Sequence, residues 1–435
     1  MEKEKFDIVI WGIGYLGVSN MIRYSAVGID VYGIDNNPRV FRDISAGTYK
    51  NDLLKNLGYS NDIYFNKKIH MGSRLEIFDF KTNNRVHLIC VPTEKYGEPY
   101  RNCLDEVITS IIAYEANSEK VTVVIESTMI PGTAEELYNR LSKNINGEVR
   151  FAVAPRRDWF VNAELGCSMV RVFGTNHEKN NEFIEYLLSL TGDTLVTATS
   201  YKEAEMCKSV ENAFRYIDIV FANQIAEAFP KINVREVLEL AGTKWNIETY
   251  HPTFGPGGYC IPLAGKYILN STMREEDISI LQKAFEFDNI RISNIAKKIL
   301  RNIEGDEKIV ILGTAYTPNI GVDKSSPIVN MIKLFQKSGV QTYIHDPFFS
   351  QEIEKRYGGN YFNPYDLCEW EGVKTIILNT AHDCYKELDI NKIIGKLGEN
   401  ARIYDNTGMW KALSYKKIRG VKYFLIGDIS WWKER

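Results

Sequence analysis

The sequence predicts an α/β protein in which two doubly wound parallel sheets flank a helical middle region. Short β-rich runs alternate with helical patterns in the first third of the chain, and the alternation returns after residue 305. Between these parts, Tyr201–Phe229 contains neither Gly nor Pro, which predicts one helix of roughly 40 Å. At 435 residues the chain exceeds what one hydrophobic core usually serves. The expected domains are residues 1–200, 201–303 and 304–435.

Apolar, β-branched runs define the expected strands in chain order. In the first domain these are Asp7–Trp11, Val31–Asp35, Val86–Val91, Val121–Glu126, Phe151–Val153 and Val170–Phe173. In the middle, helices are expected at Arg235–Ala241 and Ile278–Ile303, on either side of the Gly/Pro-rich segment Phe254–Pro262. The last domain should contain strands Lys308–Leu312, Gln341–His345, Lys374–Asn379, Arg402–Tyr404 and Tyr423–Ile426, with a helix at Ile328–Ser338.

Composition and charge exclude several classes of function. The formal net charge of -3 gives no electrostatic footprint for nucleic acid or for an acidic membrane. The apolar run Phe6–Trp11 is too short for the core of a signal peptide, and no segment approaches the ~20 apolar residues of a membrane-spanning helix. The seven cysteines show no CxxC spacing and the six histidines no metal-ligand spacing, so we expect no disulfide framework, no metal and a cytoplasmic location.

A glycine-rich turn near the N-terminus predicts a dinucleotide site. The run Gly12-Ile13-Gly14-Tyr15-Leu16-Gly17 directly follows a predicted strand and opens a predicted helix, and the next strand ends at Asp35. Gly12 would make the tight turn, Gly14 would admit the pyrophosphate and Gly17 would let helix and strand pack closely. The Asp35 carboxylate would accept ribose hydroxyls and repel a 2′-phosphate, which favours NAD over NADP. The alternative is a glycine turn that binds nothing.

Two further groups are candidates for chemistry. Lys208 and Asn212 are four residues apart on the long predicted helix and therefore share a face, although such a pair is usually a solvated helix surface. Cys260 follows three glycines within Phe254–Pro262, where a ligand could approach the backbone closely. Its thiol could be a nucleophile, whereas a lone cysteine is more often a small buried hydrophobe.

Taken together, these residues resemble the UDP-glucose/GDP-mannose dehydrogenase family over nearly the whole chain. The family's motifs stand in its order: Gly12–Gly17, Cys90–Thr93, Ser127–Thr133, Ala204–Lys208, Asn212, Asn223, Gly255–Pro262, Lys324–Pro327 and His345–Pro347. The form Gly-Pro-Gly-Gly-Tyr-Cys-Ile-Pro resembles the branch acting on UDP-N-acetylhexosamines more than the UDP-glucose branch. Each motif is modest alone, but the ordered set is specific.

The resemblance implies two Rossmann-like domains, a homodimer through the central helix and NAD-dependent oxidation of a sugar C6 alcohol to a carboxylate, in surface-polysaccharide or modified-sugar synthesis. It implies that Cys260 is the nucleophile, that Lys208 and Asn212 stabilise an oxyanion, and that Thr128 holds water. Implied cofactor contacts are Gly12, Gly14, Tyr15, Leu16, Gly17, Asp35, Arg39, Val91, Pro92, Thr93, Ser127, Thr128 and Lys324. Implied substrate contacts are Arg156, Lys208, Asn212, Lys244, Tyr250, Gly255, Gly257 and Tyr316.

The chain departs from the family pattern at the chemistry itself. Pro155-Arg156-Arg157 stands where the family usually has Pro-Glu-Phe, Leu263-Ala264 replaces a pair containing an aspartate, and Tyr316-Thr317 replaces Phe-Lys. The lost carboxylates and the gained arginine would change the formal charge of the site by roughly three. This leaves open an already anionic substrate, an oxidation that stops after two electrons, a different hydrolytic group, or a lapsed enzyme that only binds NAD and a nucleotide sugar. If Arg156 and Arg157 only form surface salt bridges, the charge argument fails.

Overall fold

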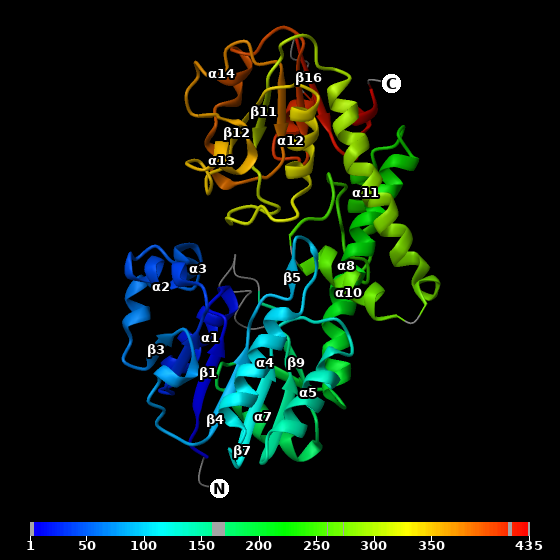
Figure 1. Ribbon diagram of the computed structural model, residues 1–435. Coiled ribbons are helices and arrows are strands. Elements are labelled where there is room, and N and C mark those ends of the chain that lie inside the picture. The colour runs from blue at the N-terminus through cyan, green and yellow to red at the C-terminus, as the bar shows by residue number, and fades with distance from the viewer. Residues whose placement is uncertain (1–3, 159–169, 259, 273, 416–419, 434–435) are drawn as a thin grey trace. The chain divides into compact units, whose positions relative to one another are not determined.

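The structure is a computed structural model that describes residues 4–158, 170–258, 260–272, 274–415 and 420–433 (Figure 1). The chain forms two compact units. The first comprises Met1–Glu211 and Lys266–Ser271, and the second comprises Asn212–Gly265 and Thr272–Arg435. Each unit contains a parallel-sheet α/β domain, and long helices form the middle of the chain, so the predicted fold class is confirmed.

The first unit is built on an eight-stranded sheet with the order β10-β9-β8-β7-β4-β1-β2-β3. Its strands are β1 (Asp7–Trp11), β2 (Val31–Ile34), β3 (Ile69–Gly72), β4 (Arg85–Ile89), β7 (Lys120–Ile125), β8 (Glu148–Val153), β9 (Val170–Thr175) and β10 (Thr194–Thr197). The expected parallel arrangement holds for every neighbouring pair except β8 and β9, which run antiparallel. The antiparallel direction of β9 could not be predicted, because the apolar pattern of a strand's sequence does not depend on the direction in which the strand runs.

Helices cover both faces of this sheet (Figure 1). They are α1 (Tyr15–Ala26), α2 (Pro38–Ser45), α3 (Asn51–Asn56), α4 (Asn102–Glu115), α5 (Thr133–Asn144) and α7 (Asn181–Ser189). Successive residues of β1 enter different cores: Ile8 and Ile10 pack in one, Val9 and Trp11 in the other. A strand buried on both faces reads as a continuous apolar run, which is why it could be located from sequence. A small hairpin, β5 (Glu94–Lys95) and β6 (Glu98–Pro99), follows β4.

The middle of the chain contains the helices α8 (Tyr201–Ala228), α9 (Val234–Ala241), α10 (Cys260–Ser271) and α11 (Ser279–Leu300). Helix α8 begins where it was predicted and ends one residue earlier. Helix α10 was not predicted, because its first residues belong to the Gly/Pro-rich segment. Pro262 is its third residue and therefore lies in the first turn, where a missing N–H breaks no helical hydrogen bond.

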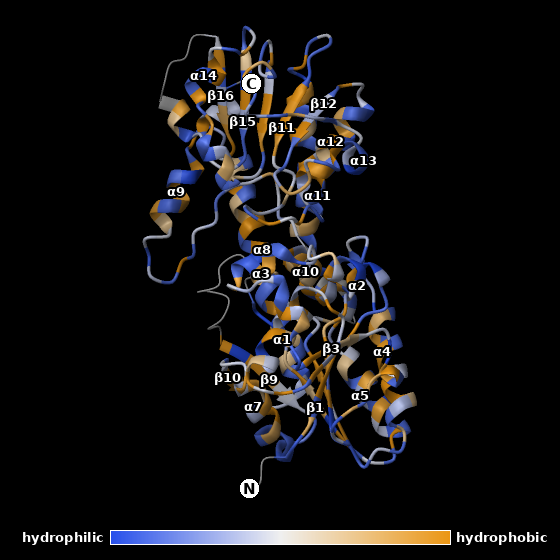
Figure 2. Cartoon of the chain, turned by 90° about the vertical axis from the view of Figure 1, so that its left-hand side faces the viewer, coloured by the Kyte–Doolittle hydropathy of each residue, from blue (hydrophilic) through white to orange (hydrophobic). Residues whose placement is uncertain are grey.

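The second unit holds a six-stranded, all-parallel sheet with the order β13-β12-β11-β14-β15-β16. The strands are β11 (Ile309–Leu312), β12 (Thr342–His345), β13 (Asn360–Tyr361), β14 (Thr375–Leu378), β15 (Ala401–Asp405) and β16 (Val421–Leu425). Its helices include α12 (Pro327–Lys337), α13 (Ile353–Tyr357) and α14 (Ile390–Ile394). The central strands β1 and β11 are coloured mostly hydrophobic in Figure 2, as expected for strands covered on both sides.

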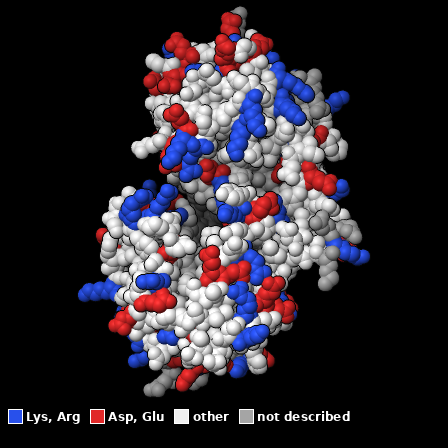
Figure 3. Space-filling model, viewed as in Figure 1, with Lys and Arg blue, Asp and Glu red and all other residues white. Residues whose placement is uncertain are grey.

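The surface is of mixed charge. In the view of Figure 3, lysine and arginine side chains are interspersed with aspartate and glutamate on each unit. Among the residues that the structure describes, no helix has both the length and the apolar character needed to cross a membrane.

Candidate active site

The glycine turn between β1 and α1 has the geometry of a phosphate-binding turn. Gly12 has φ +89°, and a Cβ on it would lie 2.8 Å from the carbonyl oxygen of Cys90. A Cβ on Gly17 would lie 1.9 Å from the carbonyl oxygen of Gly12, so these two glycines are required by packing. A Cβ on Gly14 would meet nothing within 4 Å. Open space therefore faces the N-terminal end of α1, where a pyrophosphate fits and is stabilised by free N–H groups.

Asp35 lies directly after β2 and is tied into this turn. Its carboxylate accepts hydrogen bonds from the N–H of Ile13 at 3.0 Å and from the N–H of Asn37 at 2.9 Å. The Asn37 side chain in turn accepts from the N–H of Arg39 at 3.1 Å and caps α2. The carboxylate is thus held in a fixed orientation beside the glycine turn, as a ribose-binding group requires. These residues fit NAD.

Tyr15 and Leu16 lie in the first turn of α1. The Tyr15 hydroxyl bonds the carboxylate of Asp52, and the Lys50 ammonium lies 3.8 Å from the centroid of the Tyr15 ring. Leu16 packs against the core on one face of the sheet. Burial lowers the pKa of Lys50 from its ordinary value.

The loops after β4 and β7 are joined by hydrogen bonds between predicted cofactor residues. The Ser127 hydroxyl donates to the carbonyl oxygen of Val91 at 2.7 Å, and the Thr93 hydroxyl donates to that of Thr128 at 2.5 Å. Pro92, between Val91 and Thr93, is exposed. Both loops follow the carboxyl ends of adjacent parallel strands, which is where ligands bind in sheets of this kind.

Helix α8 carries three ionisable or polar candidates on consecutive turns. The Lys208 ammonium lies 3.7 Å from the Glu211 carboxylate, and Arg157, from the loop after β8, also pairs with that carboxylate. Arg157 further donates to the carbonyl oxygen of Val170 at 2.6 Å. Asn212, the next residue after Glu211, is buried. Glu211 was not among the predicted site residues, although its i, i+3 spacing from Lys208 is visible in the sequence.

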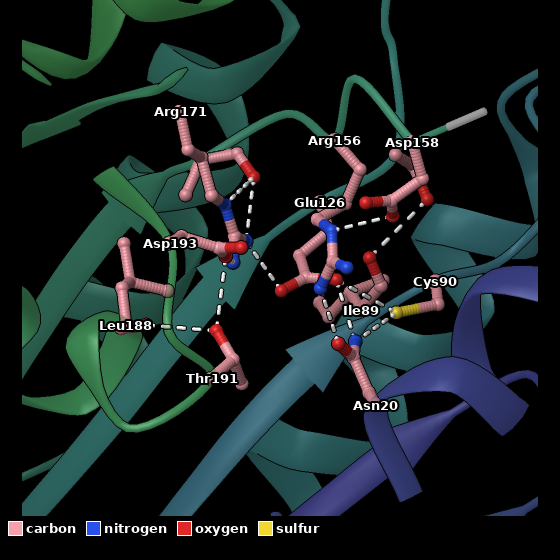
Figure 4. Close-up of polar contacts among 12 residues, drawn as sticks. Asn20, Ile89, Cys90, Glu126, Arg156, Asp158, Arg171, Leu188, Thr191 and Asp193 are labelled. Atoms are coloured by element: carbon pink, nitrogen blue, oxygen red, sulfur yellow. Dashed lines mark hydrogen bonds and ion pairs between the residues drawn. The ribbon is translucent and has the colours of Figure 1, made fainter. Parts of the chain in front are cut away.

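Arg156 points into the first unit and joins a buried network of charges (Figure 4). Its guanidinium lies 2.7 Å from the Asp158 carboxylate and donates to the Asn20 side-chain oxygen at 2.6 Å. Asn20 donates to Glu126 at 2.6 Å, and Arg171 pairs with the same carboxylate from the other side. Arg156 is therefore not a surface salt bridge.

The network balances its charges. Asp193 accepts from Arg171 and from Arg23, so that three arginines face three carboxylates: Arg23, Arg156 and Arg171 against Glu126, Asp158 and Asp193. Burial alone would raise the pKa of Glu126, but the charges of Arg171 and Arg156 outweigh it and hold that pKa below its ordinary value. Burial would lower the pKa of Arg156, but Asp158 and Glu126 reverse this and raise it. An isolated buried charge would be far more costly.

In the second unit, the glycine segment packs against the loop after β11. The N–H of Gly258 donates to the carbonyl oxygen of Lys324 at 3.1 Å. A Cβ on Gly257 would lie 2.7 Å from the Cβ of Tyr316, and one on Gly258 would lie 2.9 Å from the Tyr316 ring. Gly255 has φ +151°, which favours glycine. The structure thus brings the predicted residues Gly255, Gly257, Tyr316 and Lys324 together.

Cys260 is the first residue of α10 and its side chain is exposed. Ala264, where the resemblance to the family predicts a carboxylate, lies one turn later on the same helix and is buried. The other two substrate candidates lie before the glycine segment. Lys244 is exposed, and the Tyr250 hydroxyl donates to the Glu248 carboxylate at 2.8 Å.

Tyr267, in the second half of α10, was also missed by the sequence analysis. Its hydroxyl donates to the carbonyl oxygen of Thr93 at 2.8 Å and lies 2.7 Å from the Thr93 hydroxyl. The signal that could have identified it is its spacing of seven residues from Cys260, two helical turns, but this spacing had meaning only once a helix was recognised there.

Sequence profiles of one family match most of the chain. The profile for the NAD binding domain of the UDP-glucose/GDP-mannose dehydrogenase family matches residues 6–183, that for its central domain 202–289, and that for its UDP binding domain 310–412. The UDP-N-acetyl-D-mannosamine dehydrogenase of Methanocaldococcus jannaschii is 26% identical, covering 97% of this chain and 96% of its own. The enzyme of the same name from Pyrococcus horikoshii is 28% identical, covering 93% and 96%.

Solved structures agree in fold. The structure of UDP-D-ManNAc dehydrogenase from Pyrococcus horikoshii has a TM-score of 0.78 at 24% identity, covering 97% of this chain and 99% of that one. The UDP-N-acetyl-mannosamine dehydrogenase Cap5O from S. aureus has a TM-score of 0.80 at 18% identity, covering 98% and 100%. With three domain profiles matched in order and the dinucleotide turn in place, the chain belongs to the UDP-glucose/GDP-mannose dehydrogenase family and is an NAD-dependent oxidoreductase of nucleotide sugars.

Proposed function

We propose that this enzyme oxidises the C6 alcohol of a UDP-N-acetylhexosamine, of the UDP-N-acetylmannosamine kind, to the uronic acid. The names of the relatives support the sugar, and the glycine segment ending in Cys260 supports the full oxidation. The single observation that carries the proposal is the position of Cys260, which is exposed at the start of a helix immediately after a glycine segment that packs on Tyr316. An exposed thiol in this setting can attack a substrate carbonyl.

The proposed chemistry balances as two oxidations and one hydrolysis. The first oxidation converts the alcohol to the aldehyde, and the Cys260 thiolate then adds to the aldehyde carbon. The second oxidation converts that thiohemiacetal to a thioester, and water breaks the C–S bond to return the thiol and release the carboxylate. Bound NAD supplies the hydride acceptor, so one alcohol, two NAD⁺ and one water give one carboxylate, two NADH and three protons.

The remaining roles fall to side chains that hold charge or water. Lys208 and Asn212, one helical turn apart on α8, stabilise the oxyanion of the thiohemiacetal, and Thr128 holds the water. The Lys208 ammonium is kept in place by Glu211, which is fixed in turn by Arg157. Arg156 serves the charge network of the first unit instead of contacting substrate, and this removes the main argument for an already anionic sugar.

The test is the number of NADH molecules formed per UDP-N-acetylmannosamine consumed, with other UDP-, GDP- and dTDP-sugars and their uronic acids as a panel. We expect two NADH per sugar. One NADH would establish a two-electron dehydrogenase, and none across the panel, with NAD binding intact, would establish a protein that binds these ligands without turnover.

A cysteine variant separates the two oxidations. Cys260→Ser should stop after the aldehyde, because the second oxidation requires the thiohemiacetal. Cys368→Ser removes another exposed thiol and is the matched control, which should retain two NADH per sugar. Full turnover by Cys260→Ser would contradict the proposed role of the thiol.

A further inference from the structure

Two neighbouring side chains fasten the second half of α10 to the NAD-binding unit. The Tyr267 hydroxyl contacts both the carbonyl oxygen and the hydroxyl of Thr93, at 2.8 and 2.7 Å. The Lys266 ammonium donates to the carbonyl oxygen of Gly97 at 2.7 Å and pairs with the Glu98 carboxylate at 2.5 Å. Lys266–Ser271 accordingly belongs to the first compact unit. The last two turns of α10 are therefore fixed to the loop that follows β4.

The Thr93 hydroxyl extends this attachment to a second loop. It lies between the Tyr267 hydroxyl and the carbonyl oxygen of Thr128, to which it donates at 2.5 Å. Thr93 and Thr128 lie beyond the carboxyl ends of β4 and β7, at the edge of the sheet where a dinucleotide binds. A change in either loop when the cofactor binds would thus reach Tyr267 through hydrogen bonds.

Helix geometry connects Tyr267 to the proposed nucleophile. Cys260 and Tyr267 are seven residues apart in one helix, which places them about 10 Å apart along the axis and within about 20° of the same face. A helix segment of this length is stiff, so a rotation at Tyr267 turns the position of the Cys260 side chain with it.

The Tyr267 hydroxyl is not needed to fill the core. The side chain is 1% exposed, and a phenylalanine would fill the same volume. Tyr24, also fully buried in the first unit, is a space-filling tyrosine by comparison, because its hydroxyl has no hydrogen-bond partner among the described residues. By contrast, the Tyr267 hydroxyl makes two contacts with Thr93, so it connects α10 to the loop that follows β4.

We propose that Tyr267 is a positioning residue whose hydroxyl couples the Thr93 and Thr128 loops to the helix that begins at Cys260, so that NAD occupancy changes the reactivity of that thiol. This inference rests on the proposed function, since it assumes that Cys260 is the nucleophile. It assigns to Tyr267 no contact with substrate. Its consequence is that the thiol is presented for attack only when the cofactor site is filled.

The experiment measures the alkylation rate of Cys260 by iodoacetamide in the full-length enzyme, with and without NAD, by mass spectrometry of the cysteine peptide. Cys368, which is also exposed, is the internal reference for reagent access. In the wild type NAD should raise the Cys260 rate at least threefold and leave the Cys368 rate unchanged, and a lower Cys260 rate with NAD would contradict the proposal. In Tyr267→Phe the effect of NAD should fall below 1.5-fold, while the Kd for NAD stays within about twofold. Tyr24→Phe should behave as wild type.

Turnover gives a second readout. With kcat referred to the concentration of NAD-binding sites, which corrects for any loss of folded protein, Tyr267→Phe should lower kcat about tenfold and keep the KM for the sugar within about twofold. If Tyr267→Phe proves unstable, Thr93→Val removes the other hydroxyl of the relay and, at NAD concentrations well above the Kd measured for that variant, should reduce the same NAD effect on alkylation. An NAD effect that survives in both variants, or that is absent in the wild type, overturns the proposal. Alkylation needs no turnover, so failure of the proposed reaction would appear separately, as full activity of Cys260→Ser.

Discussion

We predict that the choice of cofactor depends on a single residue, Asp35. Its carboxylate is held by two backbone N–H groups, so it cannot turn away from a 2′-phosphate, and the repulsion between them disfavours NADP. Asp35→Asn keeps the shape and removes the charge. We expect the preference for NAD over NADP, as a ratio of kcat/KM values, to fall at least tenfold. Asp43→Asn, a carboxylate on α2 that pairs with Arg42, is the control and should keep the wild-type ratio. An unchanged ratio in Asp35→Asn would show that another group selects the cofactor.

We predict that a second residue, Asp288 on α11, makes the stability of the protein depend on pH. Burial raises the pKa of Asp288 to about 6, against the opposing charge of Arg291 and the bond from the Tyr216 hydroxyl. The folded protein therefore keeps a proton that the unfolded chain has lost between about pH 4 and 6, and its stability falls as pH rises through that window. A shift of about two pKa units corresponds to roughly 3 kcal/mol.

The asparagine of Asp288→Asn cannot ionise, so this variant should not lose stability as the pH rises from about 4 to 6. Its thermal midpoint, relative to wild type, should rise by several degrees between pH 4.5 and pH 7.5, since about 1 kcal/mol moves the midpoint by 2–4 °C in a domain of this size. Asp306→Asn, at an exposed carboxylate between α11 and β11, is the control and should change little. A difference between Asp288→Asn and wild type that does not vary with pH would show that Asp288 is ionised in the folded protein.

Among the elements, the turn into α1 separates what a glycine does for folding from what it does for binding. Gly17→Ala would place a methyl group against the Gly12 carbonyl oxygen, so it should lower the thermal midpoint and weaken NAD binding together. Gly14→Ala meets open space and should fold normally, yet lose at least tenfold in NAD affinity because the methyl occupies the place of the pyrophosphate. Calorimetric titration with NAD checks both. Normal NAD affinity in Gly14→Ala would mean that the pyrophosphate lies elsewhere.

Helix α8 exposes large aromatic side chains. Phe214 and Phe221 are seven residues apart, hence on one face, and are 64% and 58% exposed. Phe221 also borders a groove of about 320 Å³ between α8 and the start of α11. We predict that this face forms the homodimer. Phe221→Glu should give a monomer in sedimentation, while Phe65→Glu, an equally exposed site in the first unit, should not. A dimeric Phe221→Glu would exclude this interface.

The elements also show where prediction from sequence succeeds. The bounds of β1 and α8 were predicted to within one residue. A continuous apolar run is typical of a strand buried on both faces, and a long stretch free of Gly and Pro is typical of one helix. The glycine site was predictable because its residues are contiguous. Tyr267 was not, since Pro262 obscured the helix that carries it. The partners of Arg156 could not be predicted either, because Asn20 and Glu126 are distant in sequence and meet it only in the folded unit.

For the whole molecule, the two units should respond to different ligands. The glycine turn and Asp35 lie in the first unit, and the profile of the UDP binding domain matches residues 310–412 in the second, each with its own sheet and cores. A ligand that binds only the folded form stabilises it by about 2.7 kcal/mol at a concentration one hundred times its Kd.

Scanning calorimetry should therefore show two transitions, of which NAD raises one and UDP the other. Gly14→Ala assigns them, because it should abolish the shift caused by NAD and keep the shift caused by UDP. Since α8 and α10 run through both units, adding both ligands should raise each transition further than its own ligand does alone. A single transition moved by either ligand would mean that the units unfold together, and that the cofactor and nucleotide sites share one cooperative structure.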